Sequence, residues 1–265
     1  MYEGERLQLP NHHLHYRLDG DATDSAKPWL LFCNSLGTDL HMWDAQAAGL
    51  SPYFRVLRYD RRGHGKSDAP SPPYSLTDLG RDVIALLDAL KIERAHFCGL
   101  SIGGLTGQWL GINAGTRFDR LVLCATAAKI GTEESWNARI DAVKTNGLAA
   151  MTEATAERWF TSQFRSAHKE AVGAILETFA GIDPEGYNGC CAALAAADLR
   201  EEIRRIAHPV LAISGSDDSV CPPGDLQYIA DNVQRGKHLA LPGRHIVNVE
   251  SAQEFNAALL GFLIE

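Results

Sequence analysis

The sequence predicts an α/β fold with a doubly wound, mostly parallel, eight-stranded sheet and a helical lid inserted after the sixth strand. Short apolar runs alternate with helical patterns, as expected when crossover helices join parallel strands. The alternation stops near residue 127 and resumes near residue 207, and helical patterns fill the interval. The 265 residues can form one large domain carrying such an insertion. We therefore expect a core domain formed by residues 1–126 and 207–265, and a lid formed by residues 127–206.

The expected strands fall into two kinds. Residues 5–18 read as a pair of short strands joined near Pro10–Asn11. The others are rich in apolar residues, and the unbroken apolar run at 29–33 is typical of a parallel strand covered on both faces. These six strands are expected at 29–33, 55–60, 95–98, 120–124, 209–214 and 237–241.

The expected helices follow from apolar residues at helical spacing. After the strand at 55–60, a stripe from Leu79 to Leu90 indicates an amphipathic helix, with Thr77 as its N-cap. Another amphipathic helix is expected at the C-terminal end, over residues 251–263. Within the insertion, helices are expected at 136–143, 153–163, 171–179 and 190–206.

The charge balance limits the class of partner. The formal net charge is −8 at pH 7, and no run rich in lysine or arginine offsets it. This balance argues against a nucleic-acid partner or an anionic membrane surface. It allows an anionic small substrate only where local positive charge is present.

The six cysteines show no metal-binding spacing, and we expect free thiols in a reducing cytoplasm. His12, His13 and His15 have no acidic or thiol ligand beside them in the sequence, so we expect no metal site there. Met1–Glu5 lacks the basic flank and apolar core of a signal peptide. No apolar stretch approaches the roughly 20 residues needed to span a membrane.

The stretch Gly99-Leu100-Ser101-Ile102-Gly103 predicts a nucleophile. It joins an apolar strand to a helical pattern, the context in which Gly-x-Ser-x-Gly forms a sharp turn that exposes the serine. The small neighbours suit a position where strand and helix crowd together. A glycine-rich turn carrying an ordinary serine is the alternative interpretation.

A serine hydroxyl needs a base and an acid that orients the base. In this architecture both are expected after later strands, with the acid first and the histidine last. His245 follows the last strand, whereas His238 lies inside that strand and His208 precedes another. Asp218 is preferred over Asp217 as the acid because of its Gly-x-x-Asp spacing, and Asp217 remains the alternative.

The loop Asn34–Thr38 follows a central strand, where enzymes of this class place ligand contacts. Gly37 allows the backbone to turn so that the N–H of Leu36 faces the serine. A plain turn is the alternative. The basic loop after the next strand, Arg61–Ser67, lacks the spacing of a phosphate-binding P-loop, and His64 within it is expected to be structural.

Taken together, these motifs resemble the α/β-hydrolases over the whole chain. Asn34–Gly37 takes the place of the His-Gly-x-x oxyanion loop of that family, and Asp60–Ser67 matches its Asp-x-Arg-Gly-x-Gly-x-Ser loop. The resemblance implies acyl transfer by Ser101, His245 and Asp218, without a metal or an organic cofactor. It also implies that the backbone N–H groups of Leu36 and Ile102 bind the oxyanion.

Within the family, three segments resemble the 3-oxoadipate enol-lactonases. They are Asn34–Leu40, Gly99–Leu110 and Gly186–Leu194. That branch opens the enol-lactone ring in the protocatechuate limb of the β-ketoadipate pathway. The resemblance therefore implies a small lactone carrying a carboxylate as substrate.

Trp136 and Arg139 are candidates to bind the lactone ring and its carboxylate. They lie three residues apart, so they can share one helix face. The alternative is that Trp136 packs the lid and Arg139 is solvated. The sequence indicates no oligomeric state.

Several related activities compete with the lactonase hypothesis. Haloalkane dehalogenases and epoxide hydrolases use aspartate at the nucleophile position, so Ser101 argues against both. A general carboxylesterase or a cofactor-free perhydrolase would keep the same three residues. A small-ligand receptor of this fold with intact catalytic residues is a further alternative.

Overall fold

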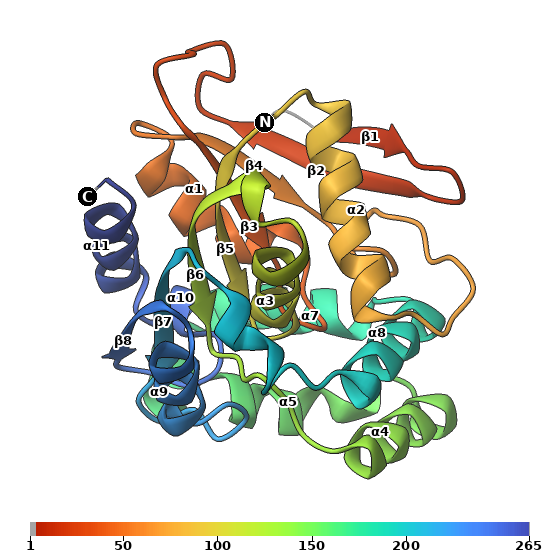
Figure 1. Ribbon diagram of the computed structural model, residues 1–265. Helices are drawn as coiled ribbons and strands as arrows, with labels where there is room; N and C mark the ends of the chain where they lie inside the picture. Colours follow the sequence, from red (N-terminus) through yellow and green to blue (C-terminus); the bar gives the residue numbers. More distant parts are fainter. Residues whose placement is uncertain (1–3, 265) are drawn as a thin grey trace.

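In the computed structural model, which describes residues 4–264, eight strands form a single sheet (Figure 1). The strand order is β1-β2-β4-β3-β5-β6-β7-β8. β2 is antiparallel to both of its neighbours, and the other pairs are parallel. The strands are β1 (Glu5–Gln8), β2 (His13–Asp19), β3 (Trp29–Cys33), β4 (Arg55–Tyr59), β5 (Ala95–Leu100), β6 (Phe118–Cys124), β7 (Pro209–Gly215) and β8 (Arg235–Leu241).

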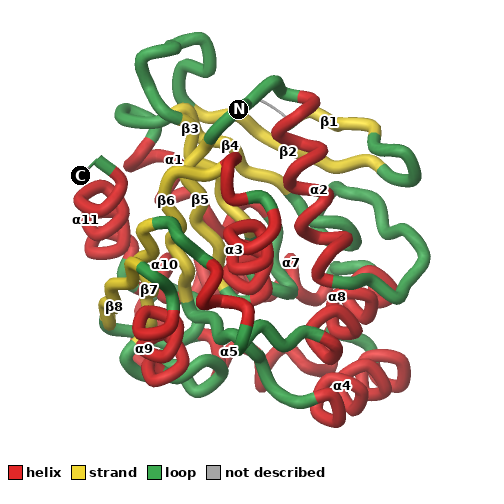
Figure 2. Tube along the Cα trace, viewed as in Figure 1, coloured by secondary structure: helices red, strands yellow, loops and turns green. Residues whose placement is uncertain are grey.

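The central strands are buried because helices cover both faces of the sheet. Every residue of β5 is buried, as expected for a strand between two helical layers. The three helices α2 (Leu76–Ala89), α3 (Ile102–Asn113) and α9 (Pro223–Asn232) lie in front of the sheet in Figure 1. On the other face, α1 (Asp44–Leu50) packs against α11 (Ala252–Leu263). Figure 2 shows the same arrangement of strands between helices, which confirms the predicted fold class.

The N-cap predicted for α2 was wrong by two residues. Ser75 rather than Thr77 is the N-cap, and its hydroxyl accepts the N–H of Asp78 at 3.2 Å. The Asp78 carboxylate in turn accepts the N–H of Ser75 at 2.9 Å. This reciprocal capping box satisfies two groups at once, whereas a cap at Thr77 lacks an acidic residue three positions later.

The segment between β6 and β7 is helical, with one more α-helix than the periodicity indicated and with different helix bounds. The helix expected at 153–163 is two helices, because the Thr161 hydroxyl caps a new one. The helix expected at 190–206 begins earlier, because Asp183 caps it and Pro184 occupies its first turn, and it already ends at Ala196, where the backbone becomes extended. The five helices are α4 (Glu133–Asn146), α5 (Thr152–Trp159), α6 (Ser162–Ala167), α7 (Lys169–Ala180) and α8 (Pro184–Ala196).

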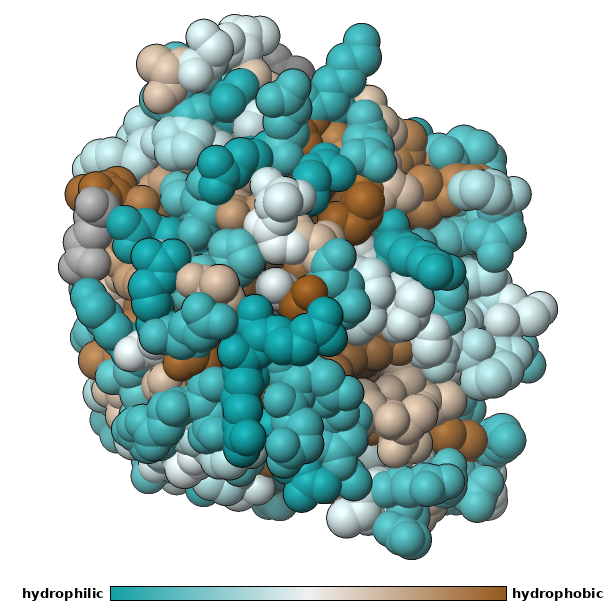
Figure 3. Space-filling model, in the orientation of Figure 1, coloured by the Kyte–Doolittle hydropathy of each residue, from teal (hydrophilic) through white to brown (hydrophobic). Residues whose placement is uncertain are grey.

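The surface shown in Figure 3 is mainly hydrophilic, with apolar residues in small separate groups. Among residues 4–264, no helix combines the length and the apolar character needed to cross a membrane.

All six cysteines are free and buried, including Cys190 and Cys191 on α8. Of the segment Met1–Glu5, the first three residues lie outside the described part of the chain.

Candidate active site

Ser101 lies at the junction between β5 and α3, as the Gly-x-Ser-x-Gly pattern predicts. Its φ of 59° and ψ of −120° form a backbone conformation that side chains other than glycine rarely adopt. Two hydrogen bonds hold this conformation: the Ser101 N–H donates to the Cys124 carbonyl at 2.9 Å, and the Thr126 hydroxyl donates to the Ser101 carbonyl at 2.7 Å. The neighbouring strand β6 therefore fixes the backbone that presents the serine.

Glycine is required at this junction because the backbones approach closely. A Cβ at Gly99 would lie 2.3 Å from the Gly103 carbonyl oxygen. A Cβ at Gly103 would lie 2.2 Å from the Cys33 carbonyl oxygen. Both distances are far inside van der Waals contact, so any side chain at either position would push α3 away from the sheet.

The structure pairs His245 with Asp218. His245 Nδ1 lies 2.9 Å from Asp218 Oδ2, and both side chains are buried. The other carboxylate oxygen, Oδ1, accepts the backbone N–H groups of Val220 at 2.7 Å and Cys221 at 3.1 Å. Asp217 is exposed, and its backbone N–H donates to the Gly243 carbonyl. Of the two candidates that the sequence left open, Asp218 is therefore the one that contacts the imidazole.

Ser101 and His245 line the same cavity, which has a volume of about 440 Å³. The core domain and the inserted helices both contribute to its walls. The residues from the core are Ser35, Leu36, Ser101, Ser219, Val220 and His245. Those from the insertion are Ile130, Ser135, Trp136, Arg139, Arg158, Trp159 and Tyr187.

The backbone N–H groups of Leu36 and Ile102 are the two candidates to bind an oxyanion. Within residues 4–264, neither donates to a protein acceptor. Leu36 lines the cavity, and Ile102 is the first residue of α3, where the helix dipole favours negative charge. The loop that carries Leu36 and the start of α3 also touch, because the Asn34 carbonyl oxygen lies 2.6 Å from the place of a Cβ on Gly103.

Trp136 and Arg139 both lie on α4 and line the cavity, as their spacing predicts. The Trp136 indole N–H donates to the Ile130 carbonyl at 2.6 Å. Because this polar group is already engaged, Trp136 offers the cavity the apolar surface of its ring. The Arg139 Nε and Nη2 atoms donate to the Tyr187 hydroxyl at 3.2 and 3.1 Å. Within the described residues, no carboxylate forms an ion pair with Arg139.

Arg158 is a cavity residue that the sequence analysis missed. It lies on α5, and its Nη2 donates to the Thr155 hydroxyl at 3.3 Å. Burial and the nearby Arg139 charge lower the pKa of its guanidinium, and within residues 4–264 it has no carboxylate partner. No motif or spacing links Arg158 to Arg139, because the two come from separate helices.

The N-terminal histidines bond to separate groups in the fold. The His12 ring contacts Asp82, the His13 ring contacts Asp68 and the His15 ring contacts Asp60. No cluster of three or more possible metal ligands occurs in the part of the chain that the structure describes.

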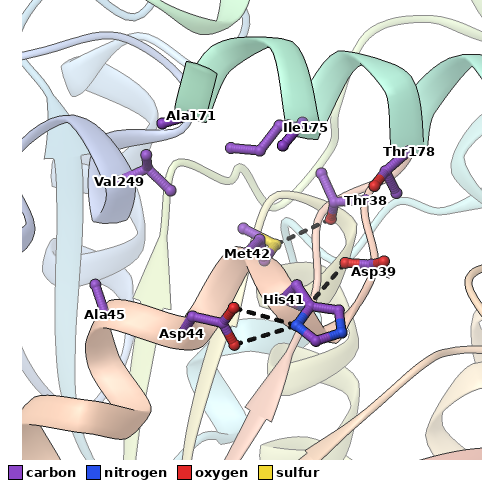
Figure 4. A pocket seen from close by; sticks show the side chains of 11 residues that line it. Thr38, Asp39, His41, Met42, Asp44, Ala45, Ala171, Ile175, Thr178 and Val249 are labelled. Atoms are coloured by element: carbon purple, nitrogen blue, oxygen red, sulfur yellow. Dashed lines mark hydrogen bonds and ion pairs between the residues drawn. The ribbon is translucent and has the colours of Figure 1, made fainter. Parts of the chain in front are cut away.

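A second cavity, of about 490 Å³, lies between α7 and the short helix η1 (Leu40–Trp43). Figure 4 shows Ala171, Ile175 and Thr178 of α7 facing Met42 and His41. Its lining is mostly apolar, and it includes neither Ser101 nor His245. Because Ser101 and His245 both line the other cavity, we take that cavity as the candidate active site.

Comparisons with known proteins agree with this geometry. The family described as alpha/beta hydrolase fold matches residues 28–179. The chain is 44% identical to 3-oxoadipate enol-lactonase 2 of Acinetobacter baylyi, over 93% of this chain and 91% of that protein. It is 42% identical to 3-oxoadipate enol-lactonase 1 of the same organism, over 89% and 88% of the two chains.

A solved structure is similar over nearly the full length. The enol-lactonase from Burkholderia xenovorans LB400 superimposes with a TM-score of 0.97 at 42% identity, covering 98% of this chain and 100% of that one. The matching family model, the level of identity and the structural similarity lead to one conclusion. The protein belongs to the α/β-hydrolase family and resembles its 3-oxoadipate enol-lactonases.

Proposed function

We propose that this protein is a serine hydrolase that opens the ring of 3-oxoadipate enol-lactone to give 3-oxoadipate, in the protocatechuate branch of the β-ketoadipate pathway. The observation that carries the proposal is a serine and an aspartate-paired histidine lining one cavity that also holds two arginines without carboxylate partners in the described residues. The enol-lactonase relatives at 42–44% identity support the choice of substrate.

In the first half of the reaction, Ser101 Oγ attacks the lactone carbonyl carbon. His245 Nε2 takes the hydroxyl proton, and Asp218 stabilises the resulting imidazolium through Nδ1. The tetrahedral intermediate collapses by breaking the bond between the carbonyl carbon and the ring oxygen. The released enol oxygen takes the proton back from His245, and the enol tautomerises to the ketone while the acyl group stays on Ser101.

In the second half of the reaction, a water molecule takes the place next to His245 that the enol oxygen occupied. The imidazole takes one proton from the water, and the hydroxide adds to the acyl carbon. The bond to Ser101 Oγ then breaks, and the proton on His245 returns to Oγ. The new carboxylic acid loses its remaining proton to solvent, so the product leaves as the dicarboxylate, and no step requires a metal or an organic cofactor.

The N–H groups of Leu36 and Ile102 bind the oxyanion in both tetrahedral intermediates. Their lack of a protein acceptor within residues 4–264 means that no existing bond must break when the charge develops. Removal of one such donor typically costs about 10²–10³-fold in rate.

Arg139 and Arg158 bind the carboxylate that the lactone carries outside its ring. Burial and the nearby Arg139 charge lower the pKa of Arg158, and an anion between the two guanidinium groups would relieve their mutual repulsion. Trp136 provides an apolar surface for the ring. We further propose that residues 127–206 act as the lid, since this segment supplies both arginines and seven of the thirteen residues that line the cavity.

The test is a substrate panel with the wild type and Ser101→Ala. We expect multiple turnovers on the enol-lactone with a kcat/KM well above that for p-nitrophenyl acetate. The alanine variant should lose at least about 10⁴-fold, because the nucleophile, base and acid act as a unit.

The rival activities predict different results from the same panel. Equal kcat/KM values on both substrates would indicate a general esterase. Tight binding of the lactone with almost no turnover would indicate a receptor. Wild-type lactone hydrolysis by Ser101→Ala would contradict the mechanism itself.

A further inference from the structure

The loop after β4, residues 60–67, packs against the loop that carries Leu36, and His64 forms one of the contacts between them. The Gly37 N–H donates to His64 Nε2 at 3.0 Å. The side chain of His64 is buried and its ring stacks on Tyr187, with centroids 6.3 Å apart. Gly37 directly follows Leu36, so this bond fixes the peptide on one side of the proposed oxyanion donor.

Other bonds fix the peptides on the opposite side of Leu36. The Arg61 guanidinium donates to the Asn34 carbonyl. The Ser35 N–H donates to the Met42 sulfur at 3.3 Å, and the Ser35 carbonyl accepts the Thr38 hydroxyl at 3.0 Å. The N–H of Leu36 is thus left without a protein acceptor, within residues 4–264, in a loop whose neighbouring N–H groups at 35 and 37 are both engaged.

His64 can accept this bond only as a neutral ring with its proton on Nδ1. Nδ1 lies 3.4 Å from the Arg62 carbonyl oxygen, an acceptor that favours this tautomer. Burial and the charge of Arg61 lower the pKa of His64 to about 3. The ring therefore stays neutral, and Nε2 stays an acceptor, throughout the range in which an ester hydrolase works.

We propose that His64 is a positioning residue for the reaction: by accepting the Gly37 N–H, its Nε2 aims the Leu36 N–H at the oxyanion formed on Ser101. The inference rests on the proposed function, since it assigns His64 to the oxyanion site of that same reaction. His64 touches neither the substrate nor the reacting atoms. Its effect should appear in binding of the transition state and leave binding of the ground state unchanged.

The variants follow from the position of the acceptor atom. His64→Gln places an amide oxygen close to the site of Nε2 and keeps an acceptor for Gly37. His64→Leu keeps most of the volume and removes the acceptor. His96→Leu is the matched control, because His96 is also buried but lies on β5, packed against Phe54 and outside the cavity.

We expect His64→Leu to lower kcat about 10- to 100-fold, less than the full loss of one oxyanion donor, with KM changed less than threefold. His64→Gln should recover at least half of the wild-type kcat. The affinity for butaneboronic acid, which forms a tetrahedral adduct with an active-site serine, should fall in parallel with kcat in the leucine variant. His96→Leu should change the unfolding midpoint and leave kcat and boronate affinity unchanged.

The outcomes separate the inference from the proposed function. An inactive wild type would overturn the proposed function. An active wild type with unchanged kcat and boronate affinity in His64→Leu would overturn only the role of His64. A leucine variant that fails to fold leaves the glutamine variant as the test: a kcat and boronate affinity near wild type would support an acceptor role, and losses as large as 10-fold in a folded protein would contradict it.

Discussion

At the scale of single residues, Asp218 and Asp217 differ in the hydrogen bonds that their carboxylates accept. Asp218 directs one oxygen to His245 and the other to two backbone N–H groups, so its position does not depend on solvent. Asp217 has neither contact and lies in solvent, although it is adjacent in the chain. Adjacent residues of the same type therefore differ completely in what they can contribute to catalysis.

This difference predicts opposite results for two conservative variants. Asp218→Asn should lower kcat by about 10³–10⁴-fold, because an amide favours the wrong tautomer of His245 and cannot stabilise the imidazolium. Asp217→Asn should change kcat less than twofold. Steady-state kinetics on the lactone measure both, and a large loss in the Asp217 variant would reassign the acid.

The two cavity arginines predict a change in specificity that depends on substrate charge. Arg139→Gln and Arg158→Gln should each raise KM for the carboxylate-bearing lactone about 10-fold or more, since each removes a charge-assisted hydrogen bond. Hydrolysis of neutral p-nitrophenyl acetate should change less than threefold. Arg165→Gln is the control, because Arg165 pairs with Glu153 and lies outside the cavity. Equal losses on both substrates would argue against carboxylate binding.

At the scale of elements, helix ends were the features that sequence periodicity located least well. The apolar stripe of α2 fixes which face is buried but not where the first turn begins. Ser75 and Asp78 decide that point through two mutual hydrogen bonds, which are local and could be read from the Ser-x-x-Asp spacing.

The capping box predicts unequal effects for two alanine variants in the same turn. Ser75→Ala should lower the free energy of unfolding by about 1 kcal/mol, because the N–H of Asp78 loses its acceptor. Thr77→Ala should change it by less than about 0.5 kcal/mol, since Thr77 is not the cap. Urea unfolding of the two variants measures the difference, and kcat should stay at the wild-type value in both.

At the scale of the whole molecule, burial of neutral His64 links stability to pH. The folded ring has a pKa of about 3, whereas the unfolded chain should bind a proton near pH 6.5. Below that pH the unfolded state holds more protons, so the free energy of unfolding should fall as pH decreases from about 6.5 toward 3. The groups facing the ring are the Gly37 N–H, the Arg62 carbonyl, the Tyr187 ring and the charge of Arg61.

The contribution of this one group is limited to about 1.4 kcal/mol per pH unit. Urea unfolding at pH 7, 6 and 5 should therefore show a steeper decline for the wild type than for His64→Gln, which cannot titrate. His96 and His238, whose pKa values burial also lowers, contribute the same slope to both proteins. Parallel declines would show that His64 is not neutral in the folded state.

The sequence by itself was enough to predict the fold class, the positions of the strands along the chain and the serine at the β5–α3 junction. It also singled out His245 as the histidine in the loop after the last strand. These follow from local signals: short runs rich in apolar residues for the strands, Gly-x-Ser-x-Gly for the turn, and the position of one histidine after the last strand. The choice of Asp218 was an inference from spacing, and the contact with His245 supports it.

The tertiary structure decided everything that depends on segments far apart in the chain. Arg158 and Arg139 line one cavity although they come from separate helices, and His64 contacts Gly37 because two loops from distant parts of the chain touch. Neither contact leaves a periodic or local signature, since each side chain satisfies the spacing rules of its own segment. These contacts join segments far apart in the chain, so local spacing in the sequence does not reveal which pairs of residues will meet.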